Sequence, residues 1–188
     1  MNYHMRRRLL WMLFLIGMGV PTVPANATTL ARLSFDELAQ RATGIVRARC
    51  LGSLSLWRNG EIWTETDFAV TAVNKGTAPG ILRISLPGGK VGHVQSQVDG
   101  VPIFHEGEEA FLFLWEVPGH GTYVLGWAQG TFRIARDARS GEERITQDSA
   151  AMPVFDPETH QFRRSGTRNL PLAAFQTKLR RALEGLNP

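Results

Sequence analysis

The sequence predicts a mainly β protein whose strands curl into a small barrel, with a short helix before the strands and an amphipathic helix after them. Three observations lead to this prediction. Apolar and polar residues alternate in two long stretches on either side of Asn59-Gly60, as they do in half-buried strands. Glycine and proline clusters interrupt the rest of the chain and mark turns. The run over 110–115 is apolar throughout, so this strand should be covered on both faces.

The first 27 residues have the features of a secretory signal peptide and should not belong to the fold. Three consecutive arginines at 6–8 precede a twelve-residue apolar run over 9–20, and Ala25-Asn26-Ala27 offers a small-residue cleavage site. An apolar run of that length is too short to span a bilayer comfortably. An uncleaved N-terminal anchor is the alternative. We therefore predict a bacterial periplasmic or secreted protein with no stable membrane insertion after cleavage.

The charge of the chain argues against nucleic-acid binding. The whole sequence has 21 Lys and Arg against 17 Asp and Glu, but residues 1–27 account for three of the arginines and none of the acids. The mature chain is therefore nearly neutral and lacks the basic excess that a nucleic-acid interface requires. Its length is that of a single domain. Cys50 is its only cysteine, so the core has to be stable without an internal disulfide.

Both helices are predicted from patterns at their ends and faces. Ser34 and Glu37 form a capping box, so a short helix should run from there to about residue 42. At the other end, 171–188 is predicted to be an amphipathic helix. Pro171 suits its first turn, and Leu172, Phe175, Leu179 and Leu183 recur at spacings of three and four.

A long hairpin should follow the first helix. The strand over 45–57 places Val46, Ala48 and Cys50 on its inward face, and Asn59-Gly60 is a hairpin turn because both of its residues accept positive φ. The second strand begins at Ile62. Flat strands of this length are rare, so we expect twist or bulges that let the hairpin curve around a barrel.

The remaining strands are shorter, and the chain divides into four parts. We expect a third strand over 81–86, an irregular excursion over 90–101, a central strand over 109–115, and then 123–127 and 131–135 as two strands or as one strand broken by a bulge. The predicted parts are a signal peptide (1–27), a β-barrel domain (28–146), a polar segment with a hairpin that could be mobile (147–170), and the C-terminal helix (171–188).

This order of elements is that of a five-stranded barrel of the oligonucleotide/oligosaccharide-binding (OB) type. The motifs L-S-F-D-E-L, G-I-V-R-A-R, T-D-F-A-V-T-A-V-N-K-G, L-P-G-G-K-V-G, G-E-E-A-F-L-F-L-W and G-W-A-Q-G-T-F-R-I occur in that order over about 34–136. In them the chain resembles a group of uncharacterised bacterial exported proteins, which are in turn distantly similar to netrin-like domains such as the tissue inhibitors of metalloproteinases. The resemblance implies an OB-like barrel. It does not extend to zinc chelation, because Thr28 stands where those inhibitors place a cysteine.

Two tryptophans are the candidate binding residues. Trp63 alternates with the inward residues of its strand, so we expect it to face outward and to lie near Trp57 across the hairpin. An outward aromatic pair can bind a peptide or a sugar. The alternative is that the pair packs under the terminal helices.

The sequence predicts no metal site, no cofactor and no catalytic residue. His93, His105, Glu106 and Glu109 are the residues from which a metal site could be built, but their spacing does not match a helical His-Glu-x-x-His motif. Cys50 lies on an apolar face, which favours core packing over a role as a nucleophile.

These observations favour an exported, non-enzymatic binding or interaction module whose partner is another exported protein. Two alternatives remain open at this point. One is a metal-dependent hydrolase that uses His93 and His105 with a nearby glutamate, and the other is a carbohydrate-binding module that uses the outward tryptophans.

Overall fold

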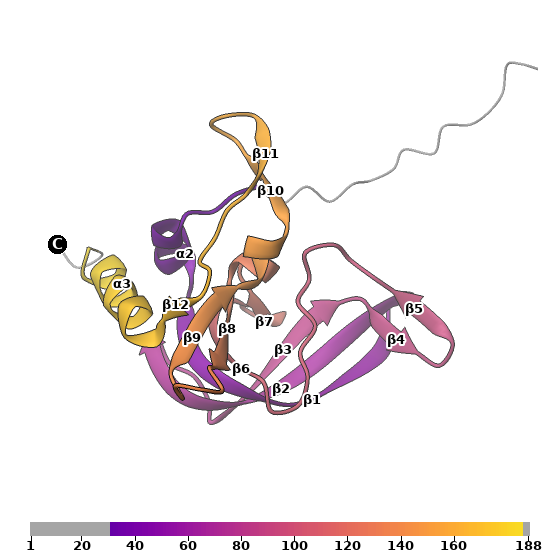
Figure 1. Cartoon of the computed structure of the whole chain (residues 1–188). Helices are drawn as coiled ribbons and strands as arrows, with labels where there is room; N and C mark the ends of the chain where they lie inside the picture. Colours follow the sequence, from indigo (N-terminus) through magenta and orange to yellow (C-terminus); the bar gives the residue numbers. More distant parts are fainter. Residues whose placement is uncertain (1–30, 186–188) are drawn as a thin grey trace, which may run out of the picture.

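The computed structural model describes residues 31–185. Within them it shows a mainly β protein with two α-helices, α2 (Phe35–Arg41) and α3 (Leu172–Glu184) (Figure 1). The predicted class and the predicted places of both helices are therefore confirmed. The predicted signal peptide (1–27) and residues 186–188 of the predicted C-terminal helix lie outside the described residues. Neither described helix is long and apolar enough to cross a membrane.

Eight strands of the described chain form one antiparallel sheet. Their order is β12-β9-β8-β6-β1-β2-β3, and β7 pairs with part of β6. The bounds are β1 (Gly44–Arg58), β2 (Glu61–Lys75), β3 (Ile81–Pro87), β6 (Glu109–Val117), β7 (Gly121–Val124), β8 (Thr131–Arg136), β9 (Glu143–Gln147) and β12 (Leu170–Pro171). Two small hairpins lie outside this sheet, β4 (Gly89–Val91) with β5 (Val94–Ser96), and β10 (Pro153–Asp156) with β11 (Gln161–Arg164).

The β1–β2 hairpin is the longest pairing in the sheet, with 15 residues in each strand. Asn59 (φ 51°) and Gly60 (φ 83°) both adopt the left-handed backbone that the predicted turn requires. Register shifts near Ile45, Arg47 and Cys50 interrupt the ladder. Such irregularities bend a strand, and Figure 1 shows the hairpin curving beneath the rest of the molecule. The predicted turn and the predicted bulges are confirmed.

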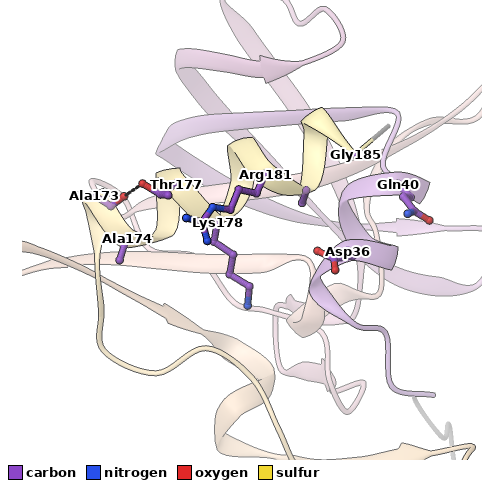
Figure 2. A pocket seen from close by; sticks show the side chains of 9 residues that line it. Asp36, Gln40, Ala173, Ala174, Thr177, Lys178, Arg181 and Gly185 are labelled. Carbon is purple, nitrogen blue, oxygen red and sulfur yellow. Dashed lines mark hydrogen bonds between the residues drawn. The ribbon is translucent and has the colours of Figure 1, made fainter. Parts of the chain in front are cut away.

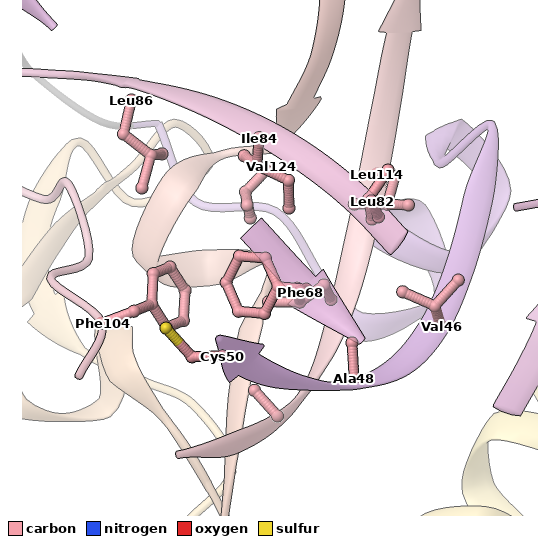
Figure 3. Close-up of a cluster of buried hydrophobic side chains, with 12 residues drawn as sticks. Val46, Ala48, Cys50, Phe68, Leu82, Ile84, Leu86, Phe104, Leu114 and Val124 are labelled. Carbon is pink, nitrogen blue, oxygen red and sulfur yellow. The ribbon is translucent and has the colours of Figure 1, made fainter. Parts of the chain in front are cut away.

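Strand β6 is the shared wall of two hydrophobic cores. Its even-numbered residues Ala110, Leu112 and Leu114 pack in the concave side of the curved sheet with Cys50, Phe68 and others (Figure 3). Its odd-numbered residues Phe111 and Phe113 pack on the opposite face under α2 and α3, with Phe132 and Phe175. A strand buried on both faces needs no polar position, which explains the uninterrupted apolar run. The predicted inward position of Cys50 is also confirmed, because its side chain is 1% exposed.

The sheet does not close into the predicted five-stranded barrel. Cα atoms of β3 and β7 come within 8 Å of one another, but no ladder joins the two strands. One edge of β6 is shared between two strands. Its C-terminal half pairs with β7 and its N-terminal half with β8, and a 3₁₀ turn, η1 (Trp127–Gln129), separates the two strands. Strand β7 is four residues long and forms no ladder with β3.

The segment that follows β9 returns to the same sheet. It forms a 3₁₀ turn, η2 (Asp148–Ala151), then the predicted hairpin as β10 and β11, and finally β12, which pairs with β9. In Figure 1 the β10–β11 hairpin projects from the body of the molecule. Strand β11 is exposed along its whole length.

Candidate functional site

A cleft opens where β1 loses its second neighbour. Strand β1 pairs with β6 as far as Arg49 opposite Glu109, and two further bonds follow, from Cys50 N to Glu108 O (2.8 Å) and from Gly107 N to Cys50 O (2.9 Å). Gly107 then turns the chain away through a left-handed backbone (φ 85°). Within residues 31–185, the part of β1 after Cys50 pairs only with β2. The segment over 97–104 faces this part of β1 across the cleft.

The cleft has a volume of about 510 Å³, within the range of ligand sites. One wall carries side chains from the inner face of the long hairpin, and the other wall is the 97–104 segment. Leu86 and Phe104 are buried at its apolar base, where the Phe104 ring packs edge-on against Phe68 at 4.9 Å. Among the described residues, Lys90 and Asp99 are the only charged ones that line the cleft. The principal lining residues are Ser53, Ser55, Thr64, Thr66, Leu86, Gly88, Gly89, Val98, Val101, Ile103, Phe104 and Met152.

Two hydroxyl pairs line the hairpin wall. Ser53 Oγ lies 2.9 Å from Thr66 Oγ1, and Ser55 Oγ lies 2.9 Å from Thr64 Oγ1. The Thr64 hydroxyl donates to the carbonyl oxygen of Gly88 at 2.7 Å, so in the second pair it must accept from Ser55. The hydroxyls of the Ser55–Thr64 pair are thus already oriented, whereas in the Ser53–Thr66 pair either oxygen can donate.

Gly89 allows the main chain to lie directly on these hydroxyls. A Cβ at this position would come within 2.3 Å of both Ser55 Oγ and Thr64 Oγ1, and its φ of 134° is a conformation that other residues rarely adopt. The Pro-Gly-Gly sequence at 87–89 therefore ends β3 and also lines the cleft beside these hydroxyls.

Arg133 connects the far wall of the cleft to the rest of the fold. Its guanidinium donates to the Ile103 carbonyl oxygen at 2.7 Å and to both carboxylate oxygens of Asp148 at 2.7 and 2.9 Å. It also binds Glu108 and lies 4.9 Å from the centre of the Phe104 ring. Burial raises the pKa of Asp148, although Arg133 opposes that shift. This one side chain therefore holds the loop that carries the wall in place.

The two candidate tryptophans do not form a pair. The register places Trp57 opposite Ile62 and Trp63 opposite Leu56, so the two indoles lie on opposite faces of the hairpin. Trp57 is 53% exposed, and the Arg58 guanidinium covers the Trp63 ring at 5.5 Å from its centre. The expectation of an outward aromatic pair was wrong, and neither indole lines the cleft.

The candidate metal ligands do not converge either. His93 is exposed in the turn between β4 and β5, and Glu106 is exposed in the turn before β6. His105 Nδ1 lies 2.9 Å from Glu108, while Glu109 is bound by Arg47 at 2.7 Å and Arg49 at 2.6 Å. In the described part of the chain, no three His, Cys, Asp or Glu side chains are grouped so as to hold a metal ion.

A second hollow lies between α2 and α3 (Figure 2). Its volume is about 820 Å³, but most of the helix α3 side chains around it are exposed. The short side chains of Ala173 and Ala174 provide few atoms that could contact a ligand. The Lys178 ammonium lies over the Phe35 ring at 4.3 Å from its centre. This hollow is an open groove between helices, whereas the β1 cleft has two walls, a base and oriented polar groups.

Thr64 and Thr66 follow Ile62 at alternate positions of β2, and the sequence analysis did not assign them to a site. The usable signal was that hydroxyl residues replace apolar ones at inward positions in the outer half of the hairpin.

Comparisons with protein-family models, with curated proteins and with solved structures gave no match.

Proposed function

We propose that the mature chain is an exported, non-enzymatic binding module that takes a segment of another exported protein in the β1 cleft. The observation that supports this most directly is the cleft itself. It is preformed, has an apolar base formed by Leu86 and Phe104, and carries two pairs of neutral hydroxyls that are hydrogen-bonded to each other. Sites of this composition favour an uncharged, partly apolar ligand.

The two alternatives gain less support from the same geometry. The only aromatic residue that lines the cleft is Phe104, which is 6% exposed, so no aromatic platform is available there for a sugar ring. A metal-dependent hydrolase would need His93 and His105 to approach a common point, and they lie in separate turns with different neighbours. A polypeptide segment is therefore the ligand class that the cleft suits best.

The architecture and the N-terminal sequence add to the proposal. We interpret the strand order β3-β2-β1-β6-β7, with β3 next to β7, as an OB-like barrel that is open along one seam. Barrels of this type commonly bind ligands on the curved sheet and its loops. Export rests on the charged, apolar and cleavage-site features of residues 1–27. Sequencing the N-terminus of protein recovered from the periplasm or the medium tests it, and a first residue of Thr28 is expected.

A peptide selection tests the binding function. Random ten-residue peptides displayed on phage are panned against the mature chain, and the affinities of synthetic copies are measured by fluorescence polarisation. Ile103→Glu places a charge at the cleft and should weaken binding about tenfold or more. Ile81→Glu is the matched control, because both isoleucines are largely exposed (70% and 64%) and only Ile103 lines the cleft. Failure to select any peptide, or equal loss in both variants, would refute the proposal.

A further inference from the structure

The outer half of β1 is an unprotected sheet edge. After the bonds between Cys50 and residues 107–108, no ladder within the described chain covers the side of β1 that faces away from β2. Alternate N–H and C=O groups of residues 51–58 therefore point into the cleft opening or into solvent. An edge of this kind is a template on which another extended chain can pair.

Apart from the register shift between Cys50 and Gly52 at its start, this edge lacks the features that usually discourage pairing. Residues 51–58 read L-G-S-L-S-L-W-R, with no proline, no lysine and no charge before Arg58. Leu51 is 44% exposed, Leu54 68% and Trp57 53%. Exposed apolar side chains along a free strand edge usually promote aggregation. Here the same stretch supplies Ser53 and Ser55 to the wall of the cleft, so the free edge and the candidate site are one surface.

We propose that the partner segment binds as an added β-strand on the free edge of β1, over residues 51–58. This inference rests on the proposed function and specifies its ligand: an extended stretch of polypeptide with uncharged side chains. Main-chain hydrogen bonds to β1 supply much of the affinity, as in other cases of strand addition. Alternate side chains of the added strand enter the cleft beside Ser53 and Ser55, and the intervening ones lie next to Leu54 on the outer face.

The far wall of the cleft argues for a peptide segment rather than a second copy of the chain. The 97–104 segment stands opposite the free edge and is held by the bond from Arg133 to the Ile103 carbonyl. The proposal places one extended chain in the cleft, whose volume is about 510 Å³, between this wall and β1. A second copy that paired through its own β1 would bring its own wall against this one, because a two-fold interface presents the same surface from both sides.

Backbone methylation of the selected peptide tests the mode of binding. Each amide of the tightest-binding peptide is N-methylated in turn, which removes one donor and leaves the side chains unchanged. Strand addition predicts an alternating profile, in which every second methyl group weakens binding about tenfold or more and the others change it less than threefold. Hydrogen exchange of the mature chain should slow at residues 51–58 when this peptide binds. Residues 161–164 of β11, a strand that is exposed throughout, should not change.

Each outcome bears on a different part of the inference. A peptide that is sensitive to Ile103→Glu, but shows a flat methylation profile and no protection of 51–58, overturns strand addition and leaves the proposed function standing. A dimeric mass by light scattering, with residues 51–58 already protected without peptide, assigns the edge to a second copy and overturns the partner segment. If no peptide is selected, the proposed function fails and this inference fails with it.

Discussion

Replacing Phe175 by alanine should remove much of the stability of the fold, because this ring joins α3 to the sheet. Phe175 is fully buried, and its ring centre lies 4.8 Å from that of Phe111, 5.2 Å from that of Phe132 and 5.7 Å from that of Phe35. Truncating a buried phenylalanine costs about 3–5 kcal/mol through lost transfer free energy and the cavity left behind. Domains of this size have only about 5–15 kcal/mol of stability in total.

Urea denaturation followed by tryptophan fluorescence measures this loss. Phe162→Ala is the matched control, since that ring is 61% exposed and packs only on Phe155 and its hairpin. The control should change the free energy of unfolding by less than about 1 kcal/mol. Phe175→Ala should also lower the melting temperature by roughly 10 °C. If both variants lost the same small amount, α3 would not be an integral part of the core, and the description of two cores sharing β6 would be wrong.

Three further predictions concern single groups. Gly89→Ala should lower the free energy of unfolding by about 2 kcal/mol in urea denaturation, because the new Cβ would collide with two hydroxyl oxygens. Gly80→Ala is the control and should be nearly neutral, because the space around Gly80 is open. Equal effects of the two substitutions would contradict the close approach at Gly89. Hydrogen bonds from Arg47 and then Arg49 lower the pKa of Glu109 from its ordinary 4.5. Glu109→Gln should therefore lower the free energy of unfolding by about 1 kcal/mol at pH 7. The difference in unfolding free energy from wild type should shrink as the pH falls below 4.5, because Glu109 then becomes protonated. A difference that stays constant with pH would count against the ion pair. Burial raises the pKa of Cys50, so its thiol should react with a disulfide reagent at pH 8 only in denaturant, and rapid native labelling would show that the core opens.

Local patterns in the sequence were enough to predict much of the fold. The Asn59-Gly60 turn, the capping box at Ser34 and the amphipathic face of α3 each depend on neighbouring residues, and each is present in the structure. The apolar run of β6 predicted burial on two sides because no other environment tolerates it. Closure of the barrel could not be predicted in the same way. It depends on whether β7 pairs with β3, two strands that are far apart in the sequence.

The faces on which Trp57 and Trp63 lie follow from the hairpin turn alone, although the sequence analysis expected the two indoles to be paired. In a two-residue hairpin the residues flanking the turn pair directly, so Arg58 must face Glu61 and Trp57 must face Ile62. Counting outward from the turn would have placed Trp57 and Trp63 on opposite faces. The cleft is a different case. Its far wall comes from 97–104, a stretch without regular alternation, and no local pattern predicts which face of the hairpin such a segment will cover.

The two halves of β1 differ in their partners, and this difference links the fold to the proposed function. Up to Cys50 the strand is central in the sheet, with β2 on one side and β6 on the other, and its inward residues belong to the core. Beyond Cys50 the residues on the same face are Ser53, Ser55 and Trp57, and the two serine hydroxyls are paired with Thr66 and Thr64 along the cleft wall. The change from apolar to hydroxyl residues thus coincides with the loss of β6 as a neighbour. The outer half of β1 extends eight residues past its pairing with β6, and exposed leucines lie along the edge that faces away from β2. The added length is explained if another chain completes the sheet there.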